Sequence, residues 1–381
     1  MKRWVLSVLI IIFCILFTCC GAVDTEEPSS EDITDLPVEV PVETTVSDTA
    51  DEPEPLPLSH NALNPLTGLY DMSSDNTGKC PFAVMLINYR YTRWQSGIGD
   101  ADIIIEAVSE QGQTQIICMY ADIRNVGVIG PVGHLYSIPL NAAYGLNPIV
   151  VHNGYPKDCP DDYAKQKEIQ TLDGEVLDSL LFVDEERNKD YLLEYSLYTD
   201  GKSINNSIYN MGGDNENKFE TTAFSFSDTE ETGMLSDFRS ADKITAIFSG
   251  AYDIDLRYNE ATGKYSKYQF LFAHSDHASK NKPLEFENAF ILFARYIYLE
   301  DLNGVRNRLV DADYSSGGKG YYFTKGCYRE IIWEKKTDEF FSLMDSDGQI
   351  LEVNPGKTYI AVVNAINDFT LSITEQETAA G

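Results

Sequence analysis

The chain has 381 residues, 43% hydrophobic and 12% aromatic, so it can bury sizeable cores, and its length favours about two domains. Its formal net charge is −31, from 60 acidic and 29 basic residues, and no cluster of Lys and Arg offsets it. Such a chain repels phosphate backbones and anionic lipid, which excludes nucleic acid as a partner and means that membrane attachment needs an apolar anchor.

The first twenty residues have the pattern of an export signal. A short basic start precedes an apolar run from Trp4 to Phe17, which suits a signal-peptide core better than a membrane span. The run ends in Cys19 and Cys20, followed by Gly21, and this ending resembles a bacterial lipobox. Cys20 is the expected site of lipid attachment, by acyl chains such as palmitate, and Cys19 is the alternative. An uncleaved N-terminal helix is the competing interpretation.

Residues 21–60 form a predicted linker. They contain twelve acidic residues, no basic residue, six prolines and no aromatic residue. Such a segment cannot bury enough apolar surface to offset its ordering entropy, so we expect a disordered acidic stalk.

Residues 61–235 are predicted to form an N-terminal domain. Short buried strands alternate with longer, partly helical stretches, which is typical of an α/β-like arrangement. The expected strands are 81–88, 102–108, 114–120 and 148–152, with helices near 135–144 and 176–182.

Residues 236–368 are predicted to form a mostly β C-terminal domain, followed by a loose tail at 369–381. The fold class expected for the whole chain is therefore α+β. The expected strands are 244–248, 252–258, 267–272, 289–297, 320–324, 328–333 and 358–363.

Four cysteines lie beyond the leader: Cys80, Cys118, Cys159 and Cys327. They have no CxxC spacing and no His partners at zinc-ligand intervals, so we expect no metal site, and no motif indicates a cofactor. Four cysteines allow three disulfide pairings, among which the sequence does not decide.

Several segments together resemble the YerB-like bacterial lipoproteins, a two-domain family of unknown biochemical function. The resemblance covers about residues 61–364. The segments that carry it are Asn64–Gly68, Pro81–Asn88, Gln95–Gly97, Ala101–Glu106, Ile129–Val132, Tyr328–Trp333, Asp347–Gly348 and Pro355–Ile360.

Three departures from the family pattern involve polar residues. Gln115 stands where the family usually has an arginine, Gly133-His134 replaces an Arg-Ser-Ala-Arg-like stretch, and Glu194–Tyr198 replaces a segment with a histidine. Converging arginines could bind a phosphate or carboxylate. The resemblance therefore implies that any such anion site has been lost here, although Gln115 and His134 remain candidate ligand-site residues.

The first domain also distantly resembles the LytR-CpsA-Psr envelope transferases. On that resemblance Asp100, Asp102 and Glu106 could form a metal-binding carboxylate set, with Arg93 as a nearby cation. The alternative is that they are strand-end and surface residues.

Histidine offers two further candidates. His152 ends a predicted strand, and it is either a ligand-site residue or a hydrogen-bonded structural histidine. His274 and His277 could be metal ligands only if their segment were helical, and the polar residues around them indicate a loop instead.

The leading hypothesis is a non-catalytic binding or scaffold lipoprotein of the cell envelope, anchored by lipid to the extracytoplasmic face of the membrane. Its partner could be an envelope protein or a glycan. An active or degenerate enzyme acting on lipid-linked or polymeric carbohydrate is the alternative. The sequence favours a non-enzyme without deciding the question.

Overall fold

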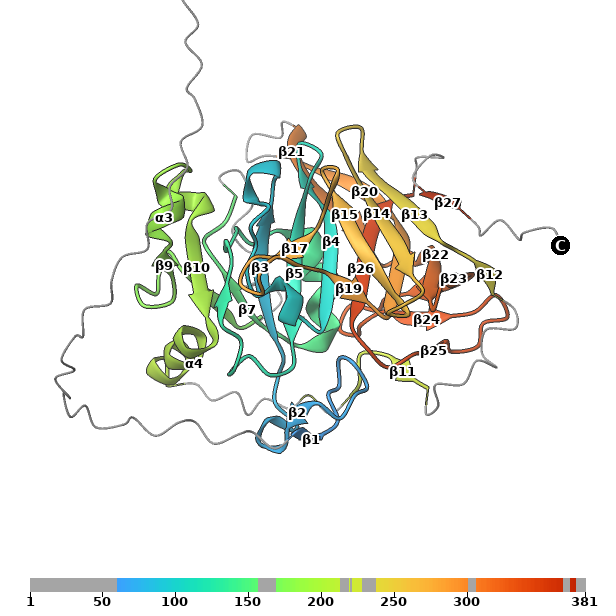
Figure 1. Cartoon of the computed structure of the whole chain (residues 1–381), viewed down its shortest axis with the longest axis horizontal. Helices are drawn as coiled ribbons and strands as arrows, with labels where there is room; N and C mark the ends of the chain where they lie inside the picture. Colours follow the sequence, from blue (N-terminus) through green and yellow to red (C-terminus); the bar gives the residue numbers. More distant parts are fainter. Residues whose placement is uncertain are drawn as a thin grey trace, which may run out of the picture. The chain divides into compact units, whose positions relative to one another are not determined.

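A sheet of twelve strands runs through most of the folded part of the chain (Figure 1). The computed structural model describes residues 60–156, 169–212, 219, 221–227, 238–300, 306–365 and 371–374. Ten of these strands follow one another in space: β12 (Arg239–Ser240), β23 (Cys327–Glu334), β22 (Gly318–Thr324), β20 (Asn288–Glu300), β21 (Arg306–Asp313), β4 (Ile103–Glu110), β5 (Gln113–Tyr120), β3 (Phe82–Asn88), β7 (Ile149–His152) and β8 (Thr171–Asp173). The other two lie off this path: β24 (Ser342–Met344) pairs with β23, and β26 (Thr358–Asn364) pairs with both β20 and β4.

A second sheet contains six strands, all from the C-terminal half. It packs against the first where β13 contacts β26 and β4. Its strands are β16 (Phe272–Ala273), β15 (Lys264–Gln269), β14 (Tyr252–Asn259), β13 (Lys243–Ser249) and β27 (Leu371–Thr374), with β19 (Glu285–Phe286) on β15.

Shorter elements complete the described chain. The helices are α1 (Ser137–Ala143), which packs against β4, β5 and β21, then α3 (Glu185–Asn188) and α4 (Gly201–Asn210). The small sheets are β1 (His60–Ala62) with β2 (Met72–Ser73), β6 (Val128–Ile129) with β10 (Leu197–Asp200) and β9 (Phe182–Val183), β11 (Ser225–Phe226) with β25 (Glu352–Val353), and β17 (Ser275–Asp276) with β18 (Lys282–Pro283).

Burial explains the sequence patterns of the strands. Every residue of β3 is buried, as are nearly all residues of β4 and β5, so these strands are covered on both faces and have continuous apolar sequences. Along β13, buried and half-buried residues alternate, as expected for a strand with one face toward the core.

The position of β26 joins the two halves of the chain. This strand pairs in parallel with β20 on one side and with β4 on the other. Pro57–Gly381 accordingly forms one compact unit. The described chain is largely β with a few helices; only at the edge, where β3, β7 and β8 run parallel, does it resemble the expected α/β arrangement.

Three expected elements differ from the structure. The tail at 369–381 was expected to be loose, but Leu371–Thr374 form β27, which pairs with β13 at the edge of the second sheet. Residues 174–180 form turns rather than a helix: the N–H groups of Val176 and Leu177 both donate to the Asp173 carbonyl oxygen, and the Leu180 N–H donates to the Leu177 carbonyl oxygen, without a continuous i to i−4 series. The strand expected at 267–272 is β15, which ends at Gln269 since Phe270 and Leu271 have φ values of 51° and 71°. The predicted leader, Cys19, Cys20, the linker to Ser59 and Cys159 lie outside the described residues.

Candidate functional site

A cavity of about 190 Å³ lies where β3 and β5 meet the segments around residues 133 and 194. We call it the Gln115 pocket. Its lining residues are Ile87, Tyr89, Glu110, Gln115, Val132, Gly133, His134, Tyr136, Asn153, Glu194 and Tyr195.

Gly133 keeps the floor of the pocket open beside Gln115. Its N–H donates to the Met85 carbonyl oxygen at 2.8 Å, and its own carbonyl oxygen accepts from the Asn153 N–H at 2.9 Å. A Cβ atom at residue 133 would lie 2.9 Å from Ile87 Cγ1 and 3.4 Å from Gln115 Oε1. A larger residue here would therefore crowd the Gln115 amide.

Gln115 presents an unpaired acceptor to the pocket. The residue is 1% exposed, and its Oε1 atom has no hydrogen-bond partner among the described residues. A buried acceptor without a donor costs about 1–3 kcal/mol. A ligand that brings an O–H or N–H group to this oxygen would recover that free energy.

Three tyrosines supply hydroxyl groups and ring faces to the same cavity. The Tyr89 hydroxyl donates to Glu110 Oε1 at 3.2 Å, and the Tyr89 and Tyr195 rings meet edge to face at 6.1 Å. Burial, with the nearby Glu110 carboxylate, raises the pKa values of Tyr89 and Tyr136 well above the usual range, while burial and Glu194 raise the pKa of Tyr195 to about 12. All three hydroxyls are therefore protonated at neutral pH.

Arg187 holds together two chain segments that wall the pocket. Its side chain is buried; Nε donates to the Tyr195 carbonyl oxygen and an NH2 group to the Tyr91 carbonyl oxygen, each at 2.7 Å. The guanidinium also lies over the rings of Tyr191, at 4.6 Å, and Trp94, at 5.3 Å. Arg187 thus positions the loops that carry Tyr89 and Tyr195.

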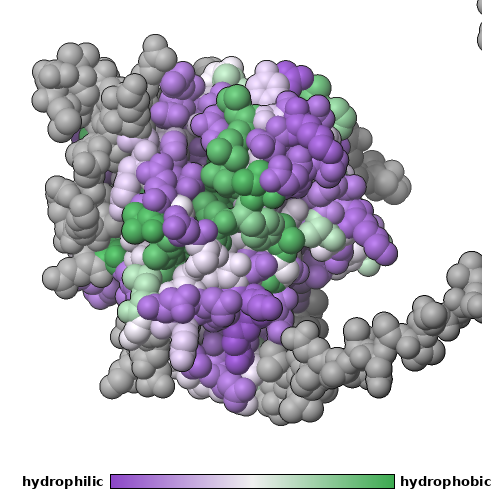
Figure 2. Space-filling model, turned by 90° about the vertical axis from the view of Figure 1, so that its left-hand side faces the viewer, coloured by the Kyte–Doolittle hydropathy of each residue, from purple (hydrophilic) through white to green (hydrophobic). Residues whose placement is uncertain are grey.

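The surface beside this wall is apolar. Figure 2, which faces the side of the molecule with β9, β10 and α3, shows a hydrophobic band between hydrophilic areas. Leu192 is 63% exposed and Leu193 is 54% exposed, and they directly precede Glu194 in the pocket. Exposed apolar patches of this kind are typical of interaction surfaces.

The structure brings together only some of the residues predicted from the sequence. Gln115 and His134 meet in the pocket, along with Glu194 from the third departing segment. Arg93 lies elsewhere, with its guanidinium 4.7 Å from the centre of the exposed Phe272 ring. His152 is fully buried; its Nδ1 hydrogen-bonds to the Gly154 carbonyl oxygen at 3.0 Å, and burial lowers the pKa of its imidazole.

Glu106 belongs to a separate buried cluster, which we call the Glu106 network. Its Oε2 atom lies 2.9 Å from Lys267 Nζ, and both side chains are 0% exposed. The five donors to its carboxylate are Asn88, Thr114, Tyr252, Lys267 and Tyr359, at distances from 2.7 to 2.9 Å. Because the donors come from both halves of the chain, the network connects the two sheets.

His274 is part of this network. It lies outside regular secondary structure, between β16 and β17, as the predicted loop requires, but its side chain is buried, which the sequence did not predict. The Lys267 ammonium donates to His274 Nδ1 at 3.0 Å and to Gln269 Oε1 at 2.7 Å. His274 Nε2–H then donates to Gln95 Oε1, which fixes the tautomer. Burial and the adjacent ammonium hold the pKa of His274 well below its usual value, so the imidazole is neutral. The sequence signal for this network was the presence of Lys267 and Gln269 within the strand predicted at 267–272.

Asp102 has a structural environment distinct from that of Glu106. It accepts from Asn64 Nδ2 at 3.0 Å and from the Ala121 N–H at 2.7 Å, and burial raises its pKa to about 6. Across the described part of the chain, no three His, Cys, Asp or Glu side chains group closely enough to hold a metal ion. The carboxylate set suggested by the transferase resemblance is therefore not assembled from Asp100, Asp102 and Glu106.

Comparison with known proteins identifies the family. Two models of a protein family of unknown function, DUF3048, match the chain: the N-terminal domain at residues 66–213 and the C-terminal domain at 244–360. The chain belongs to the DUF3048 family. The resemblance to the YerB-like lipoproteins is thereby confirmed.

Two similar proteins support this family assignment. The protein named "Putative lipoprotein YerB" from Bacillus subtilis strain 168 is 26% identical over 314 residues, which cover 81% of this chain and 88% of that protein. The crystal structure of YerB protein from Bacillus subtilis has a TM-score of 0.68 and 25% identity, over 82% of this chain and 99% of the other. Within the described residues, no helix has both the length and the apolar character needed to cross a membrane.

Proposed function

We propose that this DUF3048 protein is a lipid-anchored protein of the extracytoplasmic membrane face that binds a neutral sugar group of the cell envelope in the Gln115 pocket. The anchor would be Cys20, or Cys19, and the acidic segment 21–60 would hold the folded part away from the membrane. The signal-like leader and the name of the relative in Bacillus subtilis, a putative lipoprotein, support this location.

The unpaired Gln115 acceptor carries the proposal for the ligand. A sugar ring offers several hydroxyl donors, and one of them would satisfy Oε1. The pocket also contains three tyrosines with flat apolar ring faces and polar hydroxyl tips: Tyr89, Tyr136 and Tyr195. This combination suits a sugar ring, which is apolar on its faces and polar at its edge.

The charges around the pocket favour a neutral ligand over an anion. Its described lining contains Glu110 and Glu194 but no Lys or Arg. A phosphate or carboxylate would therefore meet negative charge without a compensating cation, whereas sugar hydroxyls can donate to both carboxylates. The cavity volume corresponds to about six water molecules at ~30 Å³ each, which suits one ring at the end of a glycan.

The test is saturation-transfer NMR of the full chain in detergent micelles with N-acetylglucosamine and its disaccharide. Replacing Gln115→Met removes the acceptor at nearly constant volume, and binding should weaken roughly tenfold, the equivalent of one hydrogen bond. The matched control is Gln113→Met, two residues earlier on β5 and outside the pocket lining, which should bind like the parent chain.

The thermal stability of Gln115→Met shows whether a loss of sugar binding comes from unfolding. Because Gln115→Met removes a buried unpaired acceptor, its thermal midpoint should be equal to or higher than that of the parent chain. Equal sugar affinities for Gln115→Met and Gln113→Met, or no binding of either sugar by the parent chain, would contradict the proposal.

A further inference from the structure

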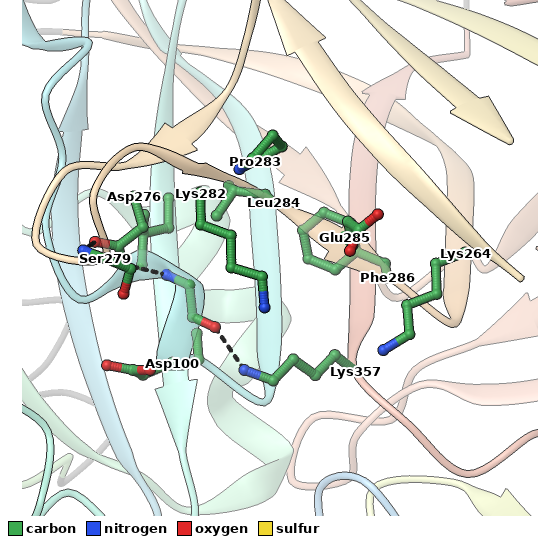
Figure 3. Close-up of a pocket in the computed structure, with 13 residues that line it drawn as sticks. Asp100, Lys264, Asp276, Ser279, Lys282, Pro283, Leu284, Glu285, Phe286 and Lys357 are labelled. Atoms are coloured by element: carbon green, nitrogen blue, oxygen red, sulfur yellow. Dashed lines mark hydrogen bonds between the residues drawn. The ribbon is translucent and has the colours of Figure 1, made fainter. Parts of the chain in front are cut away.

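A second cavity, of about 140 Å³, lies between the two halves of the chain and away from the Gln115 pocket. One wall is the segment Ile98–Ala101, which precedes β4. The other walls are the β17–β18 hairpin, the start of β15 and Lys357, just before β26 (Figure 3). Three lysines line it, Lys264, Lys282 and Lys357, so we call it the three-lysine pocket.

The three ammonium groups approach the cavity from different elements. In Figure 3 the side chains of Lys282 and Lys357 extend toward the same space, and Lys264 approaches from the opposite side. Lys357 Nζ donates to the Gly99 carbonyl oxygen at 2.5 Å, and Lys264 Nζ lies 2.5 Å from Glu287 Oε1. Lys282 is exposed, and its backbone N–H donates to the Ser279 carbonyl oxygen at 3.1 Å, but its ammonium group makes no hydrogen bond or ion pair with any described residue.

The neighbouring carboxylates are mostly occupied by backbone groups. The buried Asp276 carboxylate accepts from the N–H groups of Gly99, at 2.7 Å, and Ser279, at 3.1 Å. Glu287 Oε2 accepts from the Lys357 N–H at 2.9 Å. Asp100, at the edge, is within electrostatic reach of Lys282 and Lys357 but makes no hydrogen bond to either ammonium group.

We propose that the three-lysine pocket binds a small oxyanion of the phosphate class, with Lys282 and Lys357 as its principal contacts. Each ammonium group has three N–H donors, and Lys357 uses one of them on Gly99. Lysine binds phosphate as a point charge, without the planar geometry by which arginine selects carboxylates. Three carboxylates, of Asp100, Asp276 and Glu285, also line the cavity, and Lys264 is paired with Glu287. Backbone N–H groups bind Asp276, and the Thr262 hydroxyl donates to Glu285, so the ammonium groups of Lys282 and Lys357 keep N–H donors for an anion.

The experiment is a calorimetric titration of the full chain in detergent micelles with inorganic phosphate, at low salt. The parent chain should show saturable binding that weakens as salt is added. Lys282→Gln should bind roughly tenfold more weakly, because one charge-assisted contact is lost. Its unfolding midpoint should change little, since the Lys282 side chain is exposed and forms no hydrogen bond or ion pair with a described residue.

Lys280→Gln is the matched control, on the same hairpin but outside the cavity lining, and it should bind phosphate like the parent chain. Glycerol phosphate and glycerophosphoglycerol distinguish two sources of the group: binding of the monoester alone indicates a free metabolite, and binding of both indicates a phosphodiester headgroup or polymer. No saturable phosphate binding, or equal losses in Lys282→Gln and Lys280→Gln, would overturn the proposal. Neither result affects the Gln115 pocket.

Discussion

Replacing Lys267→Met should destabilise the protein more than almost any other single substitution of a lysine. Methionine is an unbranched side chain one atom shorter than lysine, and the change leaves the Glu106 carboxylate 0% exposed and without a counter-charge. Removing one partner of a buried ion pair costs about 3–5 kcal/mol, a large part of the ~5–15 kcal/mol that typically separates folded from unfolded protein. The thermal midpoint should fall by on the order of 10 °C.

The assay is urea and thermal unfolding of the full chain, followed by circular dichroism. Lys336→Met is the control, because Lys336 is 75% exposed and its pair with Glu339, at 3.1 Å, should contribute at most ~1 kcal/mol. The double variant Glu106→Leu/Lys267→Met should regain part of the loss, since it leaves no unpaired charge. Equal losses of less than about 1 kcal/mol for Lys267→Met and Lys336→Met would refute this reasoning.

Three further outcomes are expected. Cys20→Ala should abolish incorporation of labelled palmitate into the chain while Cys19→Ala retains it, and the reverse result would move the attachment site to Cys19. Arg187→Lys should lower the free energy of unfolding in urea by about 1–3 kcal/mol and weaken sugar binding, because lysine cannot bond both backbone carbonyl oxygens and stack on two rings. An unchanged free energy of unfolding would show that Arg187 does not hold the two segments together. Asp102 binds its proton more tightly in the folded chain, with a pKa of about 6, so its contribution to stability should fall as pH rises from about 4 to about 6. The difference in urea midpoint between the parent chain and Asp102→Asn across that range measures this fall, and a constant difference would exclude it.

The strands were the most predictable part of the fold. The continuous apolar run at 81–88 became β3, and those at 102–108 and 114–120 became β4 and β5, because strands covered on both faces need apolar residues at every position. The helix expected at 135–144 is α1 at Ser137–Ala143. What the sequence did not reveal was the order of the strands, since β26 reaches β4 from the far end of the chain.

The candidate site was predictable only in part. Gln115 and His134 were identified because they depart from a family pattern, and the structure places both in one pocket. Tyr89 and Arg187 carried no such signal. The Glu106 network was not foreseen because its ion pair joins residues far apart in sequence, and His274 lies in a segment whose polar neighbours are typical of a loop.

The parallel pairing of β26 also determines when the native state can form. If the chain is exported N-terminus first, the edge of β4 from Ile103 to Ala107 has no partner until β26 arrives, because β21 pairs with β4 only at Glu110. Until then this edge is open to pairing with foreign strands. Pairing over such a long sequence separation is slow. A product that terminates before Thr358 lacks β26, so the edge of β4 stays unpaired and the chain should be degraded readily by proteases. Pairing of β26 with β4 therefore selects for full-length molecules.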